Sequence, residues 1–100
     1  MRTHQEINER SRALAAAVVQ RIDMDADRAG LEHARTVCRR WLESHSEGCV
    51  REWCSILQNP WAKIRSILLD QSEEGNRLRQ NSPFCGILTP RERWEIYRRF

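Results

Sequence analysis

The sequence predicts an all-α protein, a compact bundle of four to five short helices with an irregular Pro/Gly latch before the C-terminal helix. Apolar residues recur at helical spacing in most of the chain. Residues that favour helix starts precede several of these stretches, and no Asn-Gly or Asp-Gly pair signals a β-hairpin. One hundred residues suit a single hydrophobic core, so residues 1–100 are expected to form one helical domain.

The first helix is expected from about Gln5 to Ile22. Its Ala-rich centre, ALAAAVV, has high helix propensity. Asp23 and Asp25 then offer turn or N-cap chemistry. The residues predicted to form a loose apolar stripe on this helix are Ile7, Leu14, Val18 and Ile22.

Apolar residues recur at helical spacing in three further segments, each of which is expected to form a helix. The second has a predicted apolar face of Leu31, Ala34, Val37, Cys38, Trp41 and Leu42, and the stretch SHSEG is expected to end it. The third begins near Cys49, with its apolar face at Val50, Trp53, Cys54 and Leu57. The fourth is expected to begin with Asn59 as N-cap and Pro60 at the first helical position, and to bury Trp61, Ile64 and Leu68.

Two short helices complete the prediction. Ser72 can cap a segment that runs to about Gln80 and whose one large apolar residue is Leu78. Thr89, Pro90 and Glu92 form a capping box with proline at the first helical position, which predicts a C-terminal helix. The predicted apolar face of that helix consists of Trp94, Ile96, Tyr97 and Phe100, and an ion pair is expected between Glu95 and Arg99.

The segment between these two helices, NSPFCGIL, follows no helical period. Pro83 disfavours helix at the residue before it, and Gly86 permits a sharp reversal of the chain. We therefore expect Phe84, Ile87 and Leu88 to fold back onto the bundle as an apolar latch. The cysteine inside this segment, Cys85, is expected to pack with the latch.

The opening of the last helix, LTPRERWEI, resembles the LTPREREVL-type opening of the helix-turn-helix domain in quorum-sensing-type transcription regulators. The resemblance covers residues 88–96 and rests on the Thr-Pro-x-Glu helix start. It implies shared capping chemistry. The turn and recognition helix that would read a DNA groove have no counterpart before Phe100.

Charge is distributed unevenly along the chain, whose net charge is +3. Residues 76–100 contain six arginines and two glutamates, so the positive surplus belongs to the C-terminal quarter. This distribution fits either phosphate contact or a solvated, salt-bridged surface. No apolar run approaches the roughly 20 residues of a membrane span, and the polar N-terminus is unlike a secretory signal, so a cytoplasmic location is expected.

Reduced thiols are expected in that compartment, so the four cysteines are free thiols or metal ligands. Cys38, Cys49 and Cys54, together with His45, could supply four zinc ligands across a helix–loop–helix. Cys38 and Cys54 also fall on apolar stripes, where cysteine packs as a small hydrophobic residue. Core packing is the favoured interpretation, and no cofactor or metal is expected.

The chain has no phosphate loop, HExxH, serine elbow or paired-carboxylate motif, so an enzyme is not expected. The four tryptophans serve either the core alone or the core and an interface, because Trp and Arg dominate interface hot spots. We expect a regulatory module, resembling an inhibitor or antitoxin or acting as an accessory subunit, that binds another protein or a second copy of itself. Phosphate contact with nucleic acid and a zinc-stabilised fold are the alternatives. The candidate partner-binding residues are Arg77, Arg79, Arg91, Trp94, Arg98 and Arg99.

Overall fold

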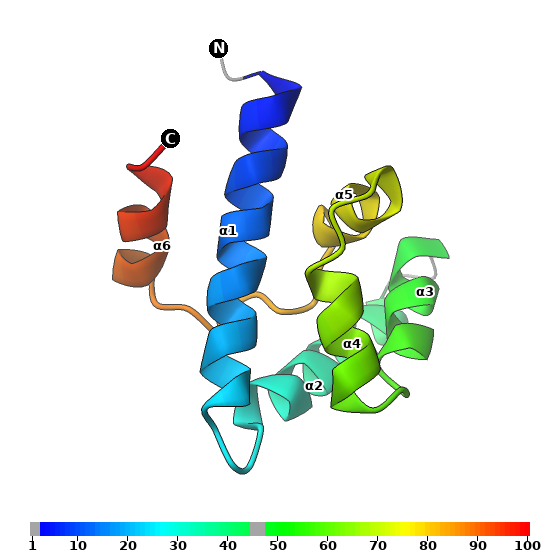
Figure 1. The fold of residues 1–100 in the computed structure, drawn as a ribbon. Coiled ribbons are helices and arrows are strands. Elements are labelled where there is room, and N and C mark those ends of the chain that lie inside the picture. The colour runs from blue at the N-terminus through cyan, green and yellow to red at the C-terminus, as the bar shows by residue number, and fades with distance from the viewer. Residues whose placement is uncertain (1–2, 45–47) are drawn as a thin grey trace.

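The computed structural model describes residues 3–44 and 48–100, and every regular element in these ranges is an α-helix (Figure 1). The predicted all-α class is confirmed. The described residues form six helices, one for each helical segment predicted above, so the count of four to five for the bundle was too low. The helices are α1 (His4–Asp23), α2 (Ala29–Ser44), α3 (Gly48–Ile56), α4 (Trp61–Leu68), α5 (Glu73–Arg79) and α6 (Pro90–Tyr97).

Helix α1 is the central element of the bundle and contacts α2, α4, α5 and α6 (Figure 1). Helix α6 lies on one side of α1, and α4 and α5 lie on the other. Helix α2 crosses the lower end of α1, and α3 packs against α2. No helix in the described part of the chain is both long enough and apolar enough to cross a membrane.

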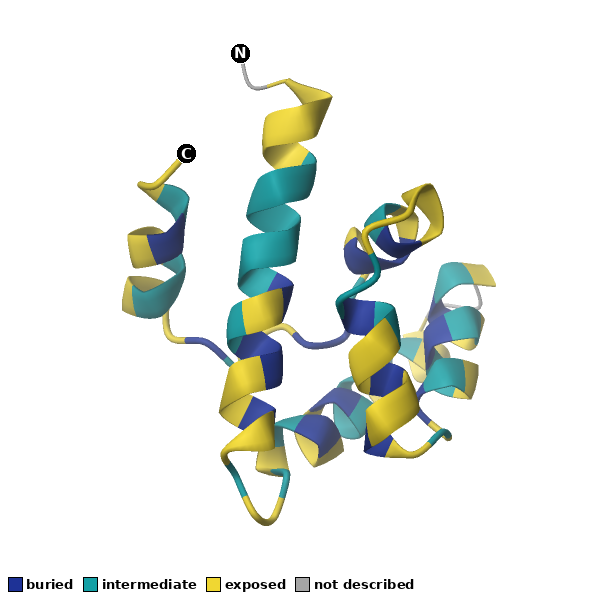
Figure 2. Ribbon diagram, in the orientation of Figure 1, coloured by how far each residue is buried: buried dark blue, intermediate teal, exposed yellow. Residues whose placement is uncertain are grey.

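Helix α1 is buried mainly along its C-terminal half (Figure 2). The predicted stripe is right at Val18 and Ile22 and wrong at Ile7, which is exposed because the first turns extend past the main core. The helix begins at His4, since Thr3 and Glu6 form a capping box in which the Glu6 N–H donates to the Thr3 hydroxyl at 3.1 Å. The Thr-x-x-Glu spacing of that box is visible in the sequence, although the prediction started the helix at Gln5.

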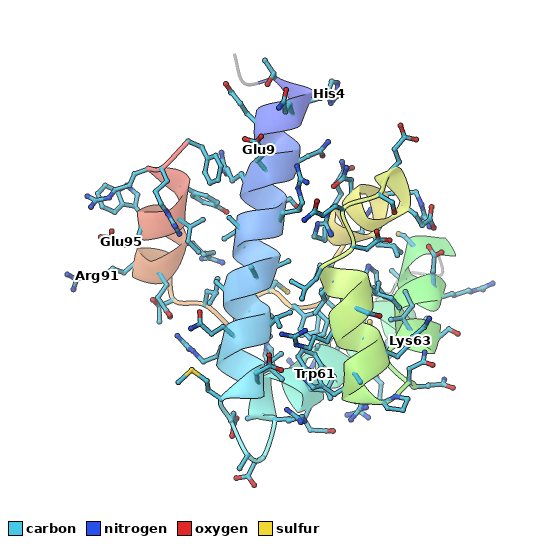
Figure 3. All side chains as sticks on the ribbon, in the orientation of Figure 1. His4, Glu9, Trp61, Lys63, Arg91 and Glu95 are labelled. Atoms are coloured by element: carbon cyan, nitrogen blue, oxygen red, sulfur yellow. The ribbon has the colours of Figure 1, made fainter. Side chains whose placement is uncertain are left out.

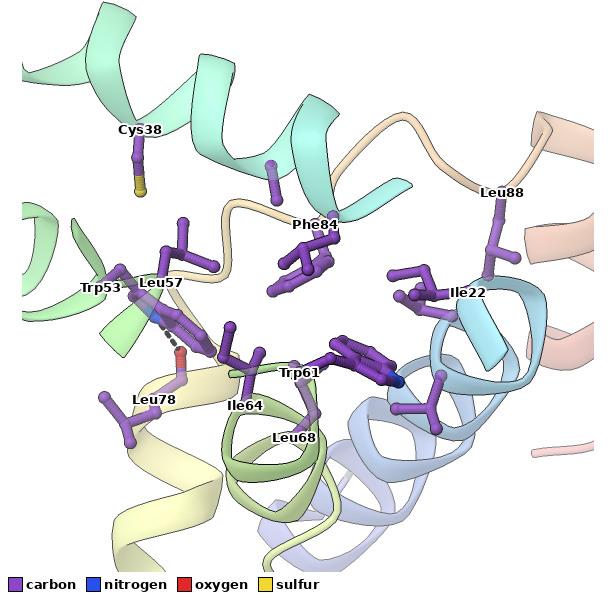
Figure 4. Packing of buried hydrophobic residues seen from close by; sticks show 14 of the residues in the cluster. Ile22, Cys38, Trp53, Leu57, Trp61, Ile64, Leu68, Leu78, Phe84 and Leu88 are labelled. Atoms are coloured by element: carbon purple, nitrogen blue, oxygen red, sulfur yellow. Dashed lines mark hydrogen bonds between the residues drawn. The ribbon is translucent and has the colours of Figure 1, made fainter. Parts of the chain in front are cut away.

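The core is centred on two tryptophans (Figure 4). Trp53 is fully buried, and its indole N–H donates to the Leu78 carbonyl at 2.9 Å. Trp61 is also buried, and its indole N–H donates to the Asp23 carboxylate at 2.7 Å. Arg65 donates to the other oxygen of the same carboxylate at 2.9 Å, so Asp23 joins the end of α1 to α4. Each buried indole thus has a polar partner near a helix end, a backbone carbonyl for Trp53 and a side-chain carboxylate for Trp61.

Two predicted helix boundaries need correction. Asn59 does not cap α4, because its side-chain amide turns back and donates to the Ile56 carbonyl at the end of α3, at 2.9 Å. Pro60 is the N-cap residue, without a side-chain cap bond, and the helix begins at Trp61. Helix α2 ends at Ser44, and the middle of the SHSEG stretch predicted to end it lies outside the described residues.

The predicted face of α2 is buried at Leu31, Ala34 and Cys38 but not at its C-terminal end. Trp41 is half-buried and Leu42 is exposed. Between α1 and α2 the Asp25 carboxylate accepts two backbone N–H groups, from Asp27 at 3.0 Å and from Ala29 at 2.9 Å. The predicted turn chemistry of Asp25 is therefore confirmed, whereas Asp23 is used to bind α4.

The apolar latch is confirmed. Phe84 is 5% exposed and packs edge-on against Trp53, with ring centroids 6.0 Å apart and an interplanar angle of 71° (Figure 4). Leu88 is buried in the same core. Gly86 has a φ of 80°, a left-handed conformation that glycine adopts without strain, and it reverses the chain as predicted. Cys85 is the exception, because this reversal leaves its side chain exposed instead of packed.

Replacing Phe84 with alanine is expected to lower the free energy of unfolding by about 3–5 kcal/mol, because it leaves a cavity beside Trp53. The matched control, Arg91→Ala on an exposed face, is expected to change it by no more than about 0.5 kcal/mol. Urea unfolding followed by far-UV circular dichroism measures both. A near-neutral Phe84→Ala protein would contradict the latch.

Candidate functional site

Helix α6 begins with the predicted capping box. The Glu92 N–H donates to the Thr89 hydroxyl at 3.1 Å, and the Thr89 N–H donates to the Glu92 carboxylate at 2.9 Å. The Thr89 backbone N–H is the largest cause that lowers the pKa of Glu92, and Arg21 lowers it further. The box fixes the first turn of a helix that is only eight residues long.

Three contacts hold α6 against α1. Ile96 is buried in the shared core. The Arg10 guanidinium carbon lies 3.7 Å from the centroid of the Tyr97 ring, a cation–π contact. Arg21 forms an ion pair with Glu92. These contacts place one face of α6 against α1 and leave the opposite face towards solvent (Figure 2).

Trp94 lies on that solvent face and is 57% exposed. The sequence placed it with Ile96 on one apolar face, which is wrong, because residues two apart on a helix point in roughly opposite directions. Ile96 faces the core, so Trp94 cannot. The Arg98 guanidinium carbon lies 5.1 Å from the centroid of the Trp94 ring.

The remaining residues of this surface are also exposed. Arg91 and Glu95 project away from α1 (Figure 3). Glu95 pairs with Arg98 at 3.3 Å rather than with Arg99 as predicted, because α6 ends at Tyr97 and Arg99 lies beyond the helical spacing. The exposed set of Arg91, Trp94, Arg98 and Arg99 is named the α6 surface below.

Arg77 and Arg79 do not lie on the α6 surface, because they belong to α5 on the other side of α1 (Figure 1). Arg77 binds Glu52 of α3 through two hydrogen bonds of 2.9 Å and also pairs with Glu74. The Arg77 hydrogen bond is the main cause that lowers the pKa of Glu52. Arg77 thus connects α5 to α3.

Arg79 is 7% exposed, so it is a buried residue of the fold. Its guanidinium donates to the Leu68 carbonyl at 3.0 Å and to the Asn76 side chain at 2.6 Å, and also to the Asp70 carbonyl. Burial is the largest cause that lowers its pKa. Its Nε has no hydrogen-bond partner in the part of the chain that is described.

The candidate zinc ligands are only partly brought together. Burial is the largest cause that raises the pKa of Cys38, to about 12, and a hydrogen bond with Cys54 adds to it. A thiol that stays protonated suits core packing better than zinc ligation, which needs a thiolate. Within residues 3–44 and 48–100 no group of three or more His, Cys, Asp or Glu side chains could hold a metal ion. His45 lies outside the described residues.

Comparisons with protein-family models, with curated proteins and with solved structures find no match to this chain. The likeness of residues 88–96 to a regulator helix therefore stays at the level of capping chemistry, which the structure contains. Support for a function therefore comes from the geometry of the site alone.

The Glu92 carboxylate predicts how the docking of α6 depends on pH. Its pKa is lowered in the folded state, so its stabilising effect is complete above the ordinary value of 4.5 and is lost as the pH falls through the lowered pKa. The protection of the amides in the first turn of α6 against hydrogen exchange, relative to their intrinsic rates, is expected to be constant from about pH 7 to about pH 5. Below about pH 5 this protection is expected to fall.

The Glu92→Gln variant is the control, because it keeps an acceptor but cannot titrate. Its α6 exchange is expected to lack the acid-dependent step that the unchanged protein shows. The same step in both proteins would mean that another carboxylate governs this end of the bundle.

Proposed function

We propose that the protein is a small helical protein-binding module that acts as a regulator, either as an inhibitor resembling an antitoxin or as an accessory subunit, in the cytoplasm. The observation that carries the proposal is Trp94, a large aromatic side chain that the fold leaves mostly exposed although it has a core. Trp and Arg are the residue types most enriched among interface hot spots. The α6 surface offers one Trp among three arginines.

The α6 surface suits recognition because its backbone is fixed before a partner arrives. The capping box fixes its first turn, and the contact of Tyr97 with Arg10 fixes its last. The Trp94 ring is held beside Arg98. A preorganised surface loses less conformational entropy on binding than a flexible one.

Charge indicates the kind of protein partner. The three arginines of the α6 surface are accompanied by the single carboxylate of Glu95. Two such surfaces would repel each other across a homodimer interface, whereas an acidic surface would pair with them. An acidic protein is therefore the favoured partner, and a homodimer is the less favoured form of the same proposal.

A second candidate is a nucleic-acid-associated protein that contacts phosphates. The observation in its favour is that Arg91 and Arg99 form no ion pair within the described part of the chain. Against it, Arg77 is bound to two glutamates and Arg79 is buried, so the basic surface is smaller than the sequence suggested.

Replacing Trp94 with alanine is expected to weaken partner binding by about thirtyfold or more, the loss of a typical hot spot, with little change in stability. The partner is to be captured from the source cell with the unchanged protein, identified by mass spectrometry, and titrated against both proteins by calorimetry. Lys63→Ala, on α4, is the matched surface control and should bind normally. Equal affinity for the Trp94→Ala protein would exclude the α6 surface.

Salt separates the two candidate functions. Affinity for an acidic protein centred on Trp94 is expected to fall by only a few-fold between about 50 and 200 mM salt, because Trp94 contributes a salt-insensitive part, whereas binding that rests on phosphate contacts alone falls by about ten- to a hundredfold. The second candidate predicts a gel shift of duplex or single-stranded nucleic acid at low salt. That shift should be lost in a double variant that carries Arg91→Ala and Arg99→Ala. Light scattering after size exclusion tests the homodimer.

A further inference from the structure

A groove of about 620 Å³ opens between α1, the latch and α6, on the side of α6 that faces α1. Small-molecule sites typically measure about 300–1,000 Å³, so its size is that of a ligand site. Its apolar lining includes Ile7, Leu14, Val18, Phe84 and Leu88. Residues of α1, α4, α5, the latch and α6 contribute to it, so it exists only in the folded arrangement.

The charged residues that line this groove are all arginines. Arg10, Arg79 and Arg93 come from three different helices, and no Asp or Glu is among the lining residues. None of the three forms an ion pair within the described residues. The groove is therefore electropositive and carries no counter-charge of its own.

Arg79 is the decisive residue, because it is more than nine-tenths buried where it lines the groove. Two carbonyls and one amide oxygen bind its outer nitrogens, but its Nε has no partner among the described residues. The nearby Arg12 guanidinium contributes to lowering its pKa, and the Asp70 carboxylate raises that pKa by less, without forming an ion pair with Arg79. A buried, unpaired cation is costly for a folded protein unless an anion compensates it.

The rest of the lining is mainly aliphatic. Ile7 is 43% exposed and Leu14 is half-buried, so both offer apolar surface that the fold does not cover. Such surface next to a buried cation suits a ligand that has an apolar body and an anionic end.

We infer that the groove binds an anionic amphiphile, a small molecule with an aliphatic body along α1 and one carboxylate or phosphate head group bound by the arginines. Arginine presents several N–H donors in a planar fork that fits either head group. One compact anion can compensate arginines that line a single groove, whereas an acidic peptide would spread its charges along a longer path. The site is distinct from the α6 surface and does not depend on the proposed protein partner.

The direct test titrates the full chain by calorimetry with four probes. Dodecanoate, dodecyl phosphate and dodecyltrimethylammonium are used below their micelle concentrations, and dodecanol is used below its solubility limit. At least one of the two anions is expected to bind at one molecule per chain, and comparison of the two identifies the preferred head group. The neutral and cationic probes are expected to bind at least about tenfold more weakly, since they lose charge-assisted hydrogen bonds. Equal binding of dodecanol, or no binding of either anion, overturns the inference.

Variants locate the site. Arg93→Gln is expected to weaken anion binding by about tenfold, and Arg91→Gln, on the same helix but outside the groove, should leave it unchanged. Ser11→Trp, on a half-buried turn of α1, is expected to fill the groove and abolish binding. Arg79→Met removes the buried cation together with hydrogen bonds that the fold uses, so lost binding in that variant would not be distinguished from unfolding. Arg93→Gln and Ser11→Trp, checked for helix content, therefore keep the inference testable.

Two further readouts test where the anion binds. Cys85 lines the groove and is exposed, so bound anion should slow its alkylation, measured by peptide mass spectrometry, relative to Cys49 on α3. Trp94→Ala should leave anion binding intact, which distinguishes failure of this site from failure of the proposed function. Unchanged affinity in both Arg93→Gln and Ser11→Trp proteins, or equal alkylation with and without anion, would overturn the inference.

Discussion

The edge-on contact of Phe84 with Trp53 is the interaction on which the arrangement of the C-terminal half depends. It fixes the latch inside the core, and the latch carries the chain from α5 on one side of α1 to α6 on the other (Figure 1). The same Trp53 donates its indole N–H to the Leu78 carbonyl, so one side chain holds both α5 and the latch. Helices of seven and eight residues have little stability of their own, so their positions follow from such contacts.

Arginine performs two different tasks in this small domain. Arg79 binds the carbonyls of Leu68, the last residue of α4, and of Asp70 just beyond it, where a helix end leaves acceptors unsatisfied, and it thereby closes the tight turn into α5. Gly75 allows that turn, because a Cβ atom there would lie 2.2 Å from the Asp70 carbonyl oxygen. The arginines of the α6 surface do not close a turn between helices in this way. The positive surplus of the C-terminal quarter is therefore partly structural. Arg79 is buried, Arg77 is exposed but paired with Glu52, and the arginines of the α6 surface are exposed.

Sequence reasoning succeeded where the signal is local. The capping box from Thr89 to Glu92 spans four residues, and the left-handed conformation of Gly86 needs only its neighbours. It failed where an element far away in the sequence determines the burial or the ion pairing of a residue. The pair of Arg77 with Glu52 joins residues 25 positions apart, and the burial of Arg79 depends on how α4 and α5 meet. The groove needs several segments in place at once, so no linear pattern could reveal it.

The orientation of α6 shows how a short helix can present two different surfaces. Ile96 is the one buried residue of α6, and the helical period therefore directs Trp94, two residues earlier, towards solvent. Arg93 precedes Trp94 by one residue and lines the groove that faces α1. A ligand bound in that groove would add contacts only to the docked position of α6, and so would stabilise the arrangement in which Trp94 faces solvent. If both proposals hold, linkage requires a partner that binds only the docked helix to favour the ligand to the same extent, although each site is built from its own residues.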